Sequence, residues 1–249
     1  MRAVFDKSTP AFASSLSGIY SLPIELDCVT AWMRRKLAAR QHLFHQGDDH
    51  THVYVVKSGF IRLYSLLDNG RSQVIGYKTP NEIVAFEHAA THRFSAQAVT
   101  EAELRCAPTS AFYNAASSDP QILRRLYNAA CEEISRAHAL VLTIAKRDAE
   151  SSVAAFIIDA DSRMAACNGG DFSALPMLRG DIANYLGLTL ETVSRVFSMF
   201  KKRHMIEVHG RHGIRLIDRA ALRAIAERIA NDGVPGLFGA ASIDARRLP

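Results

Sequence analysis

Three polar residues at helical spacing carry the clearest chemistry in this sequence of 249 residues: Glu191, Ser194 and Arg195. Residues three and four positions apart lie on one side of an α-helix. An arginine can donate two hydrogen bonds to O6 and N7 of guanine, and a glutamate can accept one from N4 of cytosine. The plainer interpretation is a surface ion pair between Glu191 and Arg195, which contributes only a few tenths of a kcal/mol. The surrounding elements decide between these two interpretations.

The segment 179–204 has the pattern of two short helices joined by a tight turn, RGDIANYLGLTLETVSRVFSMFKKRH. Gly187 permits the turn, and Thr189 can cap the second helix. Apolar residues at helical spacing are predicted to be buried: Ile182, Ala183, Leu186, Val193, Val196, Phe197 and Phe200. Glu191, Ser194 and Arg195 then lie exposed at the N-terminal end of the second helix, the end that a recognition helix places against base edges. The segment is therefore predicted to be a helix-turn-helix whose three polar residues recognise bases.

Basic and hydroxyl side chains near this motif are predicted to hold DNA phosphates: Arg179, Thr189, Thr192, Lys201, Lys202 and Arg211. Arg211 falls near the tip of a predicted hairpin, EVHGRHGIR, which would form a wing. Residues 179–230 contain ten Lys/Arg and five Asp/Glu, an excess of +5 that equals the net charge of the whole chain. A positive excess confined to one segment indicates a polyanionic partner.

A long helix is predicted from 119 to 147, with Asp119 as its N-cap and Pro120 as its first residue. Apolar residues on it alternate at spacings of four and three: Leu123, Tyr127, Ala130, Ile134, Ala137, Val141 and Ile144. Such a heptad seam is typical of a helix that pairs with a second copy of itself. The alternative is a core helix of a monomer. No charged residue interrupts the seam, so a dimer that needs no activating ligand is compatible with this pattern.

The segment 41–115 is rich in β-branched and aromatic residues and is punctuated by Gly47, Gly59 and Gly70. Asn69-Gly70 between two apolar stretches predicts a β-hairpin, and the glycine spacing is typical of an all-β roll or barrel. Short helices are predicted over 24–40, 149–166 and 219–230, a loop over 167–176, and a strand–turn–strand unit over 205–218. The fold class is therefore α+β.

Four stretches resemble motifs of the Crp/Fnr family of bacterial transcription regulators: LFHQGD, VKSGFIRLY, DAESSVAAFI and RGDIANYLGLTLETVSRVFSMFKK. The resemblance covers roughly residues 40–230 and implies a cyclic-nucleotide-binding-like β-roll, a long dimerisation helix and a winged helix-turn-helix, in that order. The pattern of Glu191, Ser194 and Arg195 resembles the Fnr/FixK branch, whose members recognise TTGAT-type half-sites in a palindrome. The implied partners are double-stranded DNA, a second copy of the chain, and RNA polymerase, for which the hairpin over 67–77 is a candidate contact.

On this basis five segments are expected along the chain. They are a flexible tail over 1–20, a β-roll over 21–118, a dimerisation helix over 119–148, a winged helix-turn-helix over 149–230 and a C-terminal tail over 231–249.

The β-roll departs from the cyclic-AMP-binding members that it resembles. Those members hold ribose and phosphate with a Gly-Glu pair and an Arg-Ser pair, where this sequence has Ala85-Phe86 and Phe94-Ser95. An aromatic ring cannot replace a carboxylate that bonds a ribose hydroxyl or an arginine that neutralises phosphate. The nearest arginine, Arg93, lies one position before the place of the arginine in that Arg-Ser pair. The chain is therefore expected not to bind cyclic AMP in that manner.

The four cysteines, Cys28, Cys106, Cys131 and Cys167, are widely scattered and form no CxxC pair. This spacing argues against a zinc module or a disulfide framework and fits a reducing cytoplasm. Oxygen-sensing Fnr members hold an iron–sulfur cluster with three N-terminal cysteines and one from the roll, whereas only Cys28 and Cys106 occupy such places here. Two thiolates cannot hold a cluster that needs four, so no cluster is expected and Cys106 is predicted to be a buried apolar residue. Whether any of Cys106, Cys131 and Cys167 responds to oxidation stays open.

The stretch HLFHQGDDHTH places His42, His45, His50 and His52 close together in sequence. Histidine is a common metal ligand, but this stretch is predicted to span two strands and their turn, with His42 and His45 on opposite faces. We therefore predict no metal site there, nor at His88 and His92. An alternative function stays open, in which a cyclic dinucleotide, haem or a metal bound in the roll switches DNA binding.

Other classes of protein are excluded by what the sequence lacks. No apolar run reaches about 18 residues, so no transmembrane helix is expected. The N-terminal residues lack the continuous apolar stretch of a secretory signal, and the expected location is the cytoplasm. No Ser/His/Asp spacing, phosphate-binding loop or paired-carboxylate motif is present, so the chain is not expected to be an enzyme.

Overall fold

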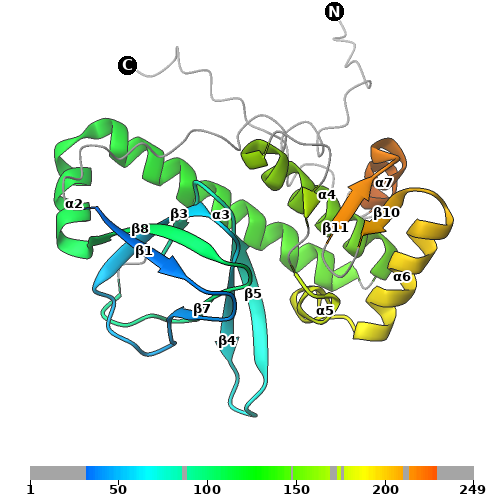
Figure 1. The fold of residues 1–249 in the computed structure, drawn as a ribbon, viewed down its shortest axis with the longest axis horizontal. Coiled ribbons are helices and arrows are strands. Elements are labelled where there is room, and N and C mark those ends of the chain that lie inside the picture. Colours follow the sequence, from blue (N-terminus) through cyan, green and yellow to red (C-terminus); the bar gives the residue numbers. More distant parts are fainter. Residues whose placement is uncertain are drawn as a thin grey trace, which may run out of the picture.

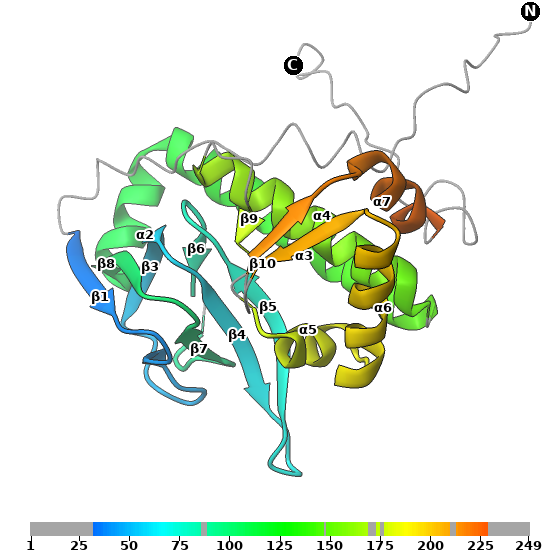
Figure 2. The same ribbon diagram turned by 45° about the vertical axis from the view of Figure 1, so that its right-hand side comes forward.

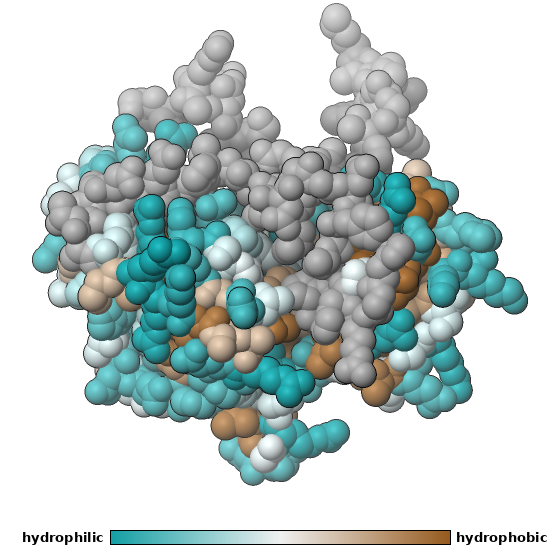
Figure 3. Space-filling view, in the orientation of Figure 1, coloured by the Kyte–Doolittle hydropathy of each residue, from teal (hydrophilic) through white to brown (hydrophobic). Residues whose placement is uncertain are grey.

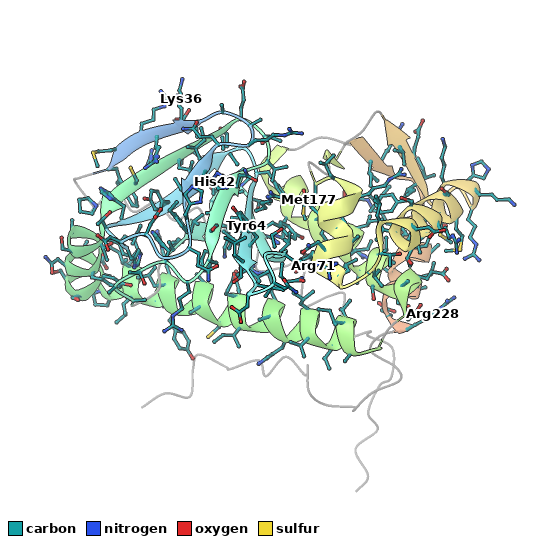
Figure 4. The ribbon with its side chains drawn as sticks, turned by 90° about the horizontal axis from the view of Figure 1, so that it is seen from below. Lys36, His42, Tyr64, Arg71, Met177 and Arg228 are labelled. Carbon is teal, nitrogen blue, oxygen red and sulfur yellow. The ribbon has the colours of Figure 1, made fainter. Side chains whose placement is uncertain are left out.

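The computed structural model describes residues 32–85, 89–146, 148–168, 173–174, 177–209 and 213–228. The predicted tails over 1–20 and 231–249 lie outside the described residues. A β-rich half and a mainly helical half lie beside each other, and one long helix, α3 (Pro120–Lys146), runs along both (Figures 1 and 4). The order of β-roll, long helix and helix-turn-helix is the α+β arrangement predicted from the sequence.

Eight strands form the β-roll: β1 Met33–Leu37, β2 His42–Phe44, β3 His52–Ser58, β4 Ile61–Leu66, β5 Ser72–Lys78, β6 Ile83–Val84, β7 Ser95–Ala98 and β8 Ala102–Pro108. They make two antiparallel four-stranded sheets, in the orders β1-β8-β3-β6 and β2-β7-β4-β5. Small and branched side chains from both sheets, such as Val56, Ala96 and Leu104, pack together in the interior. The roll is therefore filled by its own side chains.

The helix predicted over 24–40 is wrong where the structure describes it. Residues Met33–Leu37 form strand β1, which pairs antiparallel with β8 from Met33 opposite Cys106 to Leu37 opposite Ala102. Arginine and lysine favour a helix only weakly, and a tertiary partner overrides that preference. Only Leu37 of this strand is buried, so the segment carries little periodicity of its own.

The predicted Asn69-Gly70 hairpin is confirmed as the connection between β4 and β5. The amide of Gly70 donates to the carbonyl of Leu67 at 2.8 Å, and Gly70 adopts φ +75°, which suits a residue without a Cβ. The hairpin projects beyond the rest of the roll (Figure 2), and its exposed apolar residues are Leu66, Leu67 and Ile75. Hydrophobic atoms accordingly show at the lower tip of the molecule in Figure 3.

Helix α2 (Thr109–Ser118) follows β8 and was not predicted from the sequence. It buries Phe112 and Ala116, which lie four residues apart. Helix α3 begins at Pro120 as predicted, and the side chain of Asp119 accepts a hydrogen bond from the amide of Gln121 at 2.8 Å. Proline starts the new helix readily because it needs no amide partner in the first turn.

The C-terminal half contains α4 Ala149–Asn168, β9 Ser173–Ala174, α5 Arg179–Leu186, α6 Leu190–Lys202, β10 Ile206–His209, β11 Gly213–Leu216 and α7 Arg219–Ala226. Its three strands form a small sheet in the order β10-β11-β9. The loop predicted over 167–176 is wrong at its first residues, which still belong to α4, and at Ser173–Ala174, which pair with β11. Helix α7 is shorter than the predicted 219–230, because it ends at Ala226.

The two halves share one apolar core. Phe60, Val74 and Tyr77 of the roll pack in the same cluster as Ile157 of α4 and Ile182 of α5. Inward residues of α6 and α7 complete this cluster, which we call the shared core. In the described part of the chain, none of the helices is long and apolar enough to span a membrane.

The backbone of Glu101 and Ala102 lies so close to Gly59 that one added methyl group should strongly lower the stability of the fold. A Cβ there would lie 2.3 Å from the carbonyl oxygen of Glu101 and 2.6 Å from Cα of Ala102, at a φ of +87°. We expect Gly59→Ala to lower the free energy of unfolding by about 3 kcal/mol or more in urea titrations followed by circular dichroism. Gly70→Ala is the matched control, because φ is also positive but nothing lies within 4 Å of the added Cβ. It should cost only about 1 kcal/mol, and equal losses in the two variants would contradict the prediction.

Candidate nucleic-acid interface

Helices α5 and α6 meet at the predicted turn. Gly187 adopts the left-handed conformation, with φ +66° and ψ +27°, and the amide of Leu188 donates to the carbonyl of Ala183 at 2.8 Å. All seven apolar residues predicted to face the core are buried: Ile182, Ala183, Leu186, Val193, Val196, Phe197 and Phe200. The helix-turn-helix is therefore held by its own apolar contacts and by its packing in the shared core.

The predicted N-cap of α6 is confirmed. The side chain of Thr189 accepts a hydrogen bond from the amide of Thr192 at 3.1 Å, and the two hydroxyl groups lie 2.8 Å apart. This cap satisfies one of the free amides at the start of the helix and fixes where the first exposed turn begins.

Glu191 and Arg195 are the most exposed side chains in this turn. They are 73% and 78% exposed, and Nη2 of Arg195 lies 2.5 Å from Oε1 of Glu191. Both interpretations of this pair are compatible with the geometry, since an ion pair so exposed to water contributes little and exchanges readily for another partner. Ser194 is half-buried on the same side of the helix, and its carbonyl accepts a hydrogen bond from the hydroxyl of Ser198 at 2.9 Å.

Sequence reasoning missed one further residue in this turn. Leu190, the first residue of α6, is an exposed aliphatic side chain next to Glu191. An aliphatic side chain at this place can contact the C5-methyl group of thymine. The position gave no signal in the sequence, because an apolar residue directly after a cap usually faces the core.

The basic residues around the motif differ in whether a neighbouring side chain contacts them. Lys201 and Lys202 are exposed in the last turn of α6, about 15 Å along the helix from Glu191. Arg179 lies over the ring of Phe197, with its guanidinium carbon 5.2 Å from the ring centre. Arg203, in contrast, is paired with Glu150 of α4 at 2.8 Å. Arg211, predicted at the tip of the wing, lies outside the described residues.

The apolar seam of α3 is exposed along its length. Five of its large side chains are 43–67% exposed: Leu123, Tyr127, Ile134, Val141 and Ile144. Ala137 is exposed as well, and Ala130 is half-buried. The side of the helix next to the seam faces the roll, and there Glu133 and Arg136 make their ion pairs. The alternative of a helix whose seam lies in the core of a monomer is therefore wrong for the described chain.

Charged residues join the roll to α3 and α4. The carboxylate of Glu82 lies 2.6 Å from Nη2 of Arg163 and 3.5 Å from Nη1 of Arg136. Burial opposes ionisation of Glu82, but Arg163, Lys78 and Arg136 outweigh burial and lower the pKa of its carboxyl group. Likewise, Lys78 and Arg136 overcome burial and lower the pKa of Glu133 to about 2. These carboxylates are therefore ionised at neutral pH.

Aromatic side chains pack together near Phe94-Ser95, the pair that stands in place of the Arg-Ser pair of the cyclic-AMP-binding members. His92 is buried and its ring stacks on Phe44, with ring centres 3.6 Å apart, and Phe94 packs against the same interior cluster. The ring nitrogens of His50 lie 2.8 and 3.2 Å from the carbonyl oxygens of Ala85 and Ala89. Ala85 and Ala89 are therefore both held to the roll by the ring of His50.

The predicted histidine and cysteine positions can now be placed. His42 lies 2.8 Å from the hydroxyl of Tyr64, its neighbour in Figure 4. Its ring centre is only 4.2 Å from that of His45, so the prediction that these two side chains lie on opposite faces is wrong. Within the described ranges, no three His, Cys, Asp or Glu side chains form a group that could hold a metal ion. Cys106 is buried as predicted, and burial raises the pKa of its thiol. Cys131 is exposed, while Cys28, His88 and the side chain of Cys167 lie outside the described part.

Two family models match this chain. The model of a Crp-like helix-turn-helix domain matches residues 152–225, and that of a cyclic nucleotide-binding domain matches residues 34–119. Together they cover both halves of the molecule described above.

Similar curated proteins and a solved structure agree with these matches. The chain is 37% identical over 198 residues to the nitrogen fixation regulation protein FixK of Bradyrhizobium diazoefficiens, covering 78% of this chain and 81% of that protein. It is 34% identical to the transcriptional activator protein FnrA of Stutzerimonas stutzeri, over 85% and 90% of the two chains. The structure of FixK2 from Bradyrhizobium japonicum superposes with a TM-score of 0.73 at 30% identity, over 78% of this chain and 97% of that one.

The burial of His92 predicts a loss of stability in mild acid. Burial lowers the pKa of His92 to about 4, with a smaller contribution from His50, while Asp48 opposes the change. Between pH 6.5 and 4 the unfolded chain binds a proton that the folded chain does not, so stability falls as pH falls. From pH 7 to pH 5 this one group should remove about 2 kcal/mol from the free energy of unfolding.

Urea titrations at the two pH values measure this effect. His92→Gln should show a drop between pH 7 and pH 5 that is smaller than the wild-type drop by that amount. His138→Gln, at an exposed position on α3, should keep the wild-type drop. The prediction fails if all three proteins lose the same stability.

Proposed function

This chain belongs to the Crp/Fnr family of DNA-binding transcription regulators, and from that premise we propose that it acts as a homodimer on a TTGAT-type palindrome. The observation that carries the proposal is the exposed pair of Glu191 and Arg195 at the capped N-terminal end of α6. The exposed seam of α3 supports the dimer. The relatives are transcription regulators, so the function is regulation rather than catalysis.

Each protomer places the first turns of α6 in a major groove, and the two half-sites lie about 34 Å apart, one turn of the double helix. Arg195 donates two hydrogen bonds to a guanine, Glu191 accepts one from the paired cytosine or a neighbouring base, and Ser194 contacts an adjacent base. The high exposure of Glu191 and Arg195 supports these roles, because neither side chain must leave a buried partner before it meets DNA.

The remaining polar residues of the motif hold the DNA backbone. Phosphate contacts are assigned to Arg179, Thr189, Thr192, Lys201, Lys202 and Arg211. The exposure of Lys201 and Lys202 supports this assignment, since among the described residues neither lysine makes an ion pair that it would lose on reaching a phosphate. Arg203 is left out because Glu150 already neutralises it.

Two copies of α3 pair along the seam to form the dimer. The seam exposes five large apolar side chains on one side of a single helix, whereas monomers rarely leave so continuous an apolar stripe in water. Pairing these stripes removes their apolar area from water and sets the two-fold axis of the complex.

No effector is needed for DNA binding in this proposal. The stacking of His92 on Phe44 and the packing of Phe94 support a roll that binds no cyclic AMP, and the sequence lacks the three closely spaced N-terminal cysteines that hold the iron–sulfur cluster of oxygen-sensing members. The alternative, a receptor switched by a cyclic dinucleotide, haem or a metal, makes the opposite prediction. Purified protein in air, with no added ligand, should bind the palindrome with nanomolar affinity; a need for added ligand would favour the receptor.

Transcription factors of this kind act on RNA polymerase at a promoter. The β4–β5 hairpin, residues 67–77 with Leu66 beside it, is the contact surface we assign, because it projects from the roll and exposes the apolar residues Leu66, Leu67 and Ile75. A regulator that binds chromosomal DNA acts in the bacterial cytoplasm, which is the location that follows from the proposal.

Arg195→Ala tests the assigned base contact. We expect it to weaken binding to the palindrome by about 1–3 kcal/mol, or about 5- to 150-fold, because a bidentate contact to guanine is lost. Binding to an unrelated duplex should change little. Fluorescence anisotropy with both duplexes measures the ratio, and an unchanged ratio would show that Arg195 is not the base-recognising residue.

Lys202→Ala is the contrasting variant, on the same helix but at the end assigned to phosphate. It should weaken both duplexes alike and make the logarithm of affinity fall less steeply with the logarithm of salt concentration, by about one unit of slope. A salt slope equal to that of the wild type would remove Lys202 from the phosphate contacts.

Ile134→Glu tests the dimer seam. A carboxylate introduced in the middle of the apolar stripe must lose water on pairing, so the variant should sediment as a monomer at micromolar concentration. Ser135→Glu introduces the same charge one residue away, outside the seam, and should sediment as the wild type does. If both variants remain dimers, the seam is not the interface.

A further inference from the structure

Strand β5 is an edge strand, and a single side chain from the helix-turn-helix pairs with that edge. In the sheet order β2-β7-β4-β5, no strand from the described residues lies beyond β5. Oδ1 of Asn184 accepts a hydrogen bond from the amide of Val74 at 2.5 Å, and Nδ2 donates to the carbonyl of Ser72 at 2.7 Å. One residue of a neighbouring parallel strand makes the same two bonds with its own carbonyl and amide. The side-chain amide of Asn184 therefore takes the place of one residue of a fifth strand.

A side chain of the roll also donates a hydrogen bond to Asn184. Nε2 of Gln73 donates to the backbone carbonyl of Asn184 at 2.6 Å. That carbonyl belongs to the last turn of α5, where it also accepts a longer hydrogen bond, 3.4 Å, from the amide of Gly187. The three bonds that join Asn184 with Ser72, Gln73 and Val74 are referred to here as the Asn184 latch.

A second contact holds the same helix to the roll. Nη1 of Arg62 in β4 lies 2.5 Å from Oδ1 of Asp181, and Nε of Arg62 donates to the side chain of Gln97 at 2.9 Å. Asp181 precedes Asn184 by three residues, so both lie on the same side of α5. This side faces the roll, and it fixes both the position of α5 and its rotation about its own axis.

The position of α5 determines that of α6. Only Gly187, Leu188 and Thr189 separate the two helices, and Ile182 packs in the same core as Val193 of α6. Ile144, at the end of the α3 seam, lies beside the turn, with its Cγ2 3.7 Å from where a Cβ of Gly187 would stand. The latch therefore couples the orientation of the recognition helix to the roll and to α3.

We infer that Asn184 is a positioning residue for DNA recognition, which sets the distance between the two recognition helices and so the half-site spacing that the dimer prefers. This inference rests on the proposed function, because it needs two copies joined along α3. Asn184 acts through α5 on α6. Its side-chain amide is already used by β5 and is not offered to DNA.

The test compares palindromes that differ only in the spacer between half-sites, from two base pairs shorter to two longer than the best. Asn184→Ala should bind the best spacing about tenfold more weakly, as expected when two hydrogen bonds that orient a domain, one part-buried and one exposed, are lost. Binding to the other spacings and to a single half-site should stay within about twofold, so the spacing preference flattens. Gln73→Ala removes the third bond from the roll side and should flatten it in the same direction.

Asn114→Ala is the matched control, because Asn114 is exposed on α2 and, within the described part of the chain, its side chain makes no hydrogen bond with the DNA-binding half. It should keep the wild-type spacing profile. If Asn184→Ala melts at a lower temperature but keeps the wild-type profile, the residue is only structural and the inference is overturned. If Asn184→Ala does not fold, the spacing profile of Gln73→Ala tests the inference instead, and a wild-type profile in that variant would overturn it.

Hydrogen exchange of the Val74 amide separates the latch from the proposed function. Exchange at Val74 should be faster in Asn184→Ala than in the wild type and unchanged in Asn114→Ala. Equal exchange in Asn184→Ala and the wild type would show that the latch does not form, and would overturn the inference without using DNA. A wild-type protein that binds no palindrome better than a scrambled duplex would instead overturn the proposed function, and the inferred spacing role with it, whereas the exchange data would still report on the latch.

Discussion

The carboxylate of Glu82 contacts Arg163 of α4 at 2.6 Å and lies 3.5 Å from Arg136 of α3, so one half-buried charge joins three parts of the molecule. Removing one partner of such a group leaves an uncompensated charge in the interior, which is far more costly than losing a surface pair. Arg163 also donates to the carbonyl of Tyr77 at 2.7 Å, which fixes β5 against α4. This group of charges therefore fixes how the roll lies against α3 and α4.

Helices α3 and α6 each use one side for packing within the chain and leave another side exposed to solvent. α3 uses one side for the ion pairs with the roll and leaves its apolar seam to solvent. α6 buries Val193, Phe197 and Phe200 and leaves Glu191 and Arg195 in water. Each division follows the helical period of the sequence, so an exposed functional side comes with a buried side that fixes its direction.

Sequence patterns predicted the elements whose signals are local. Gly187, Thr189 and the apolar residues around them define the helix-turn-helix within 26 residues, and the seam from Leu123 to Ile144 defines α3 without reference to any other segment. Strand β1 and strand β9 were missed because each exists through its pairing partner, β8 and β11 respectively. The bonds of Asn184 were missed for the same reason: Ser72 and Asn184 lie 112 positions apart, and no single stretch of sequence shows that they meet.

The shared core has a consequence for how such proteins diversify. Phe60, Val74 and Tyr77 of the roll pack with Ile157 and Ile182, so the boundary between the two family models does not coincide with a boundary between independent folding units. A recombination event that joined this β-roll to the DNA-binding half of a distant relative would leave those three side chains against a surface of the wrong shape. A new combination of β-roll and DNA-binding half must therefore arise by point substitutions in both halves of the shared core. Otherwise α4, α5 and strand β5 must be inherited together as one unit.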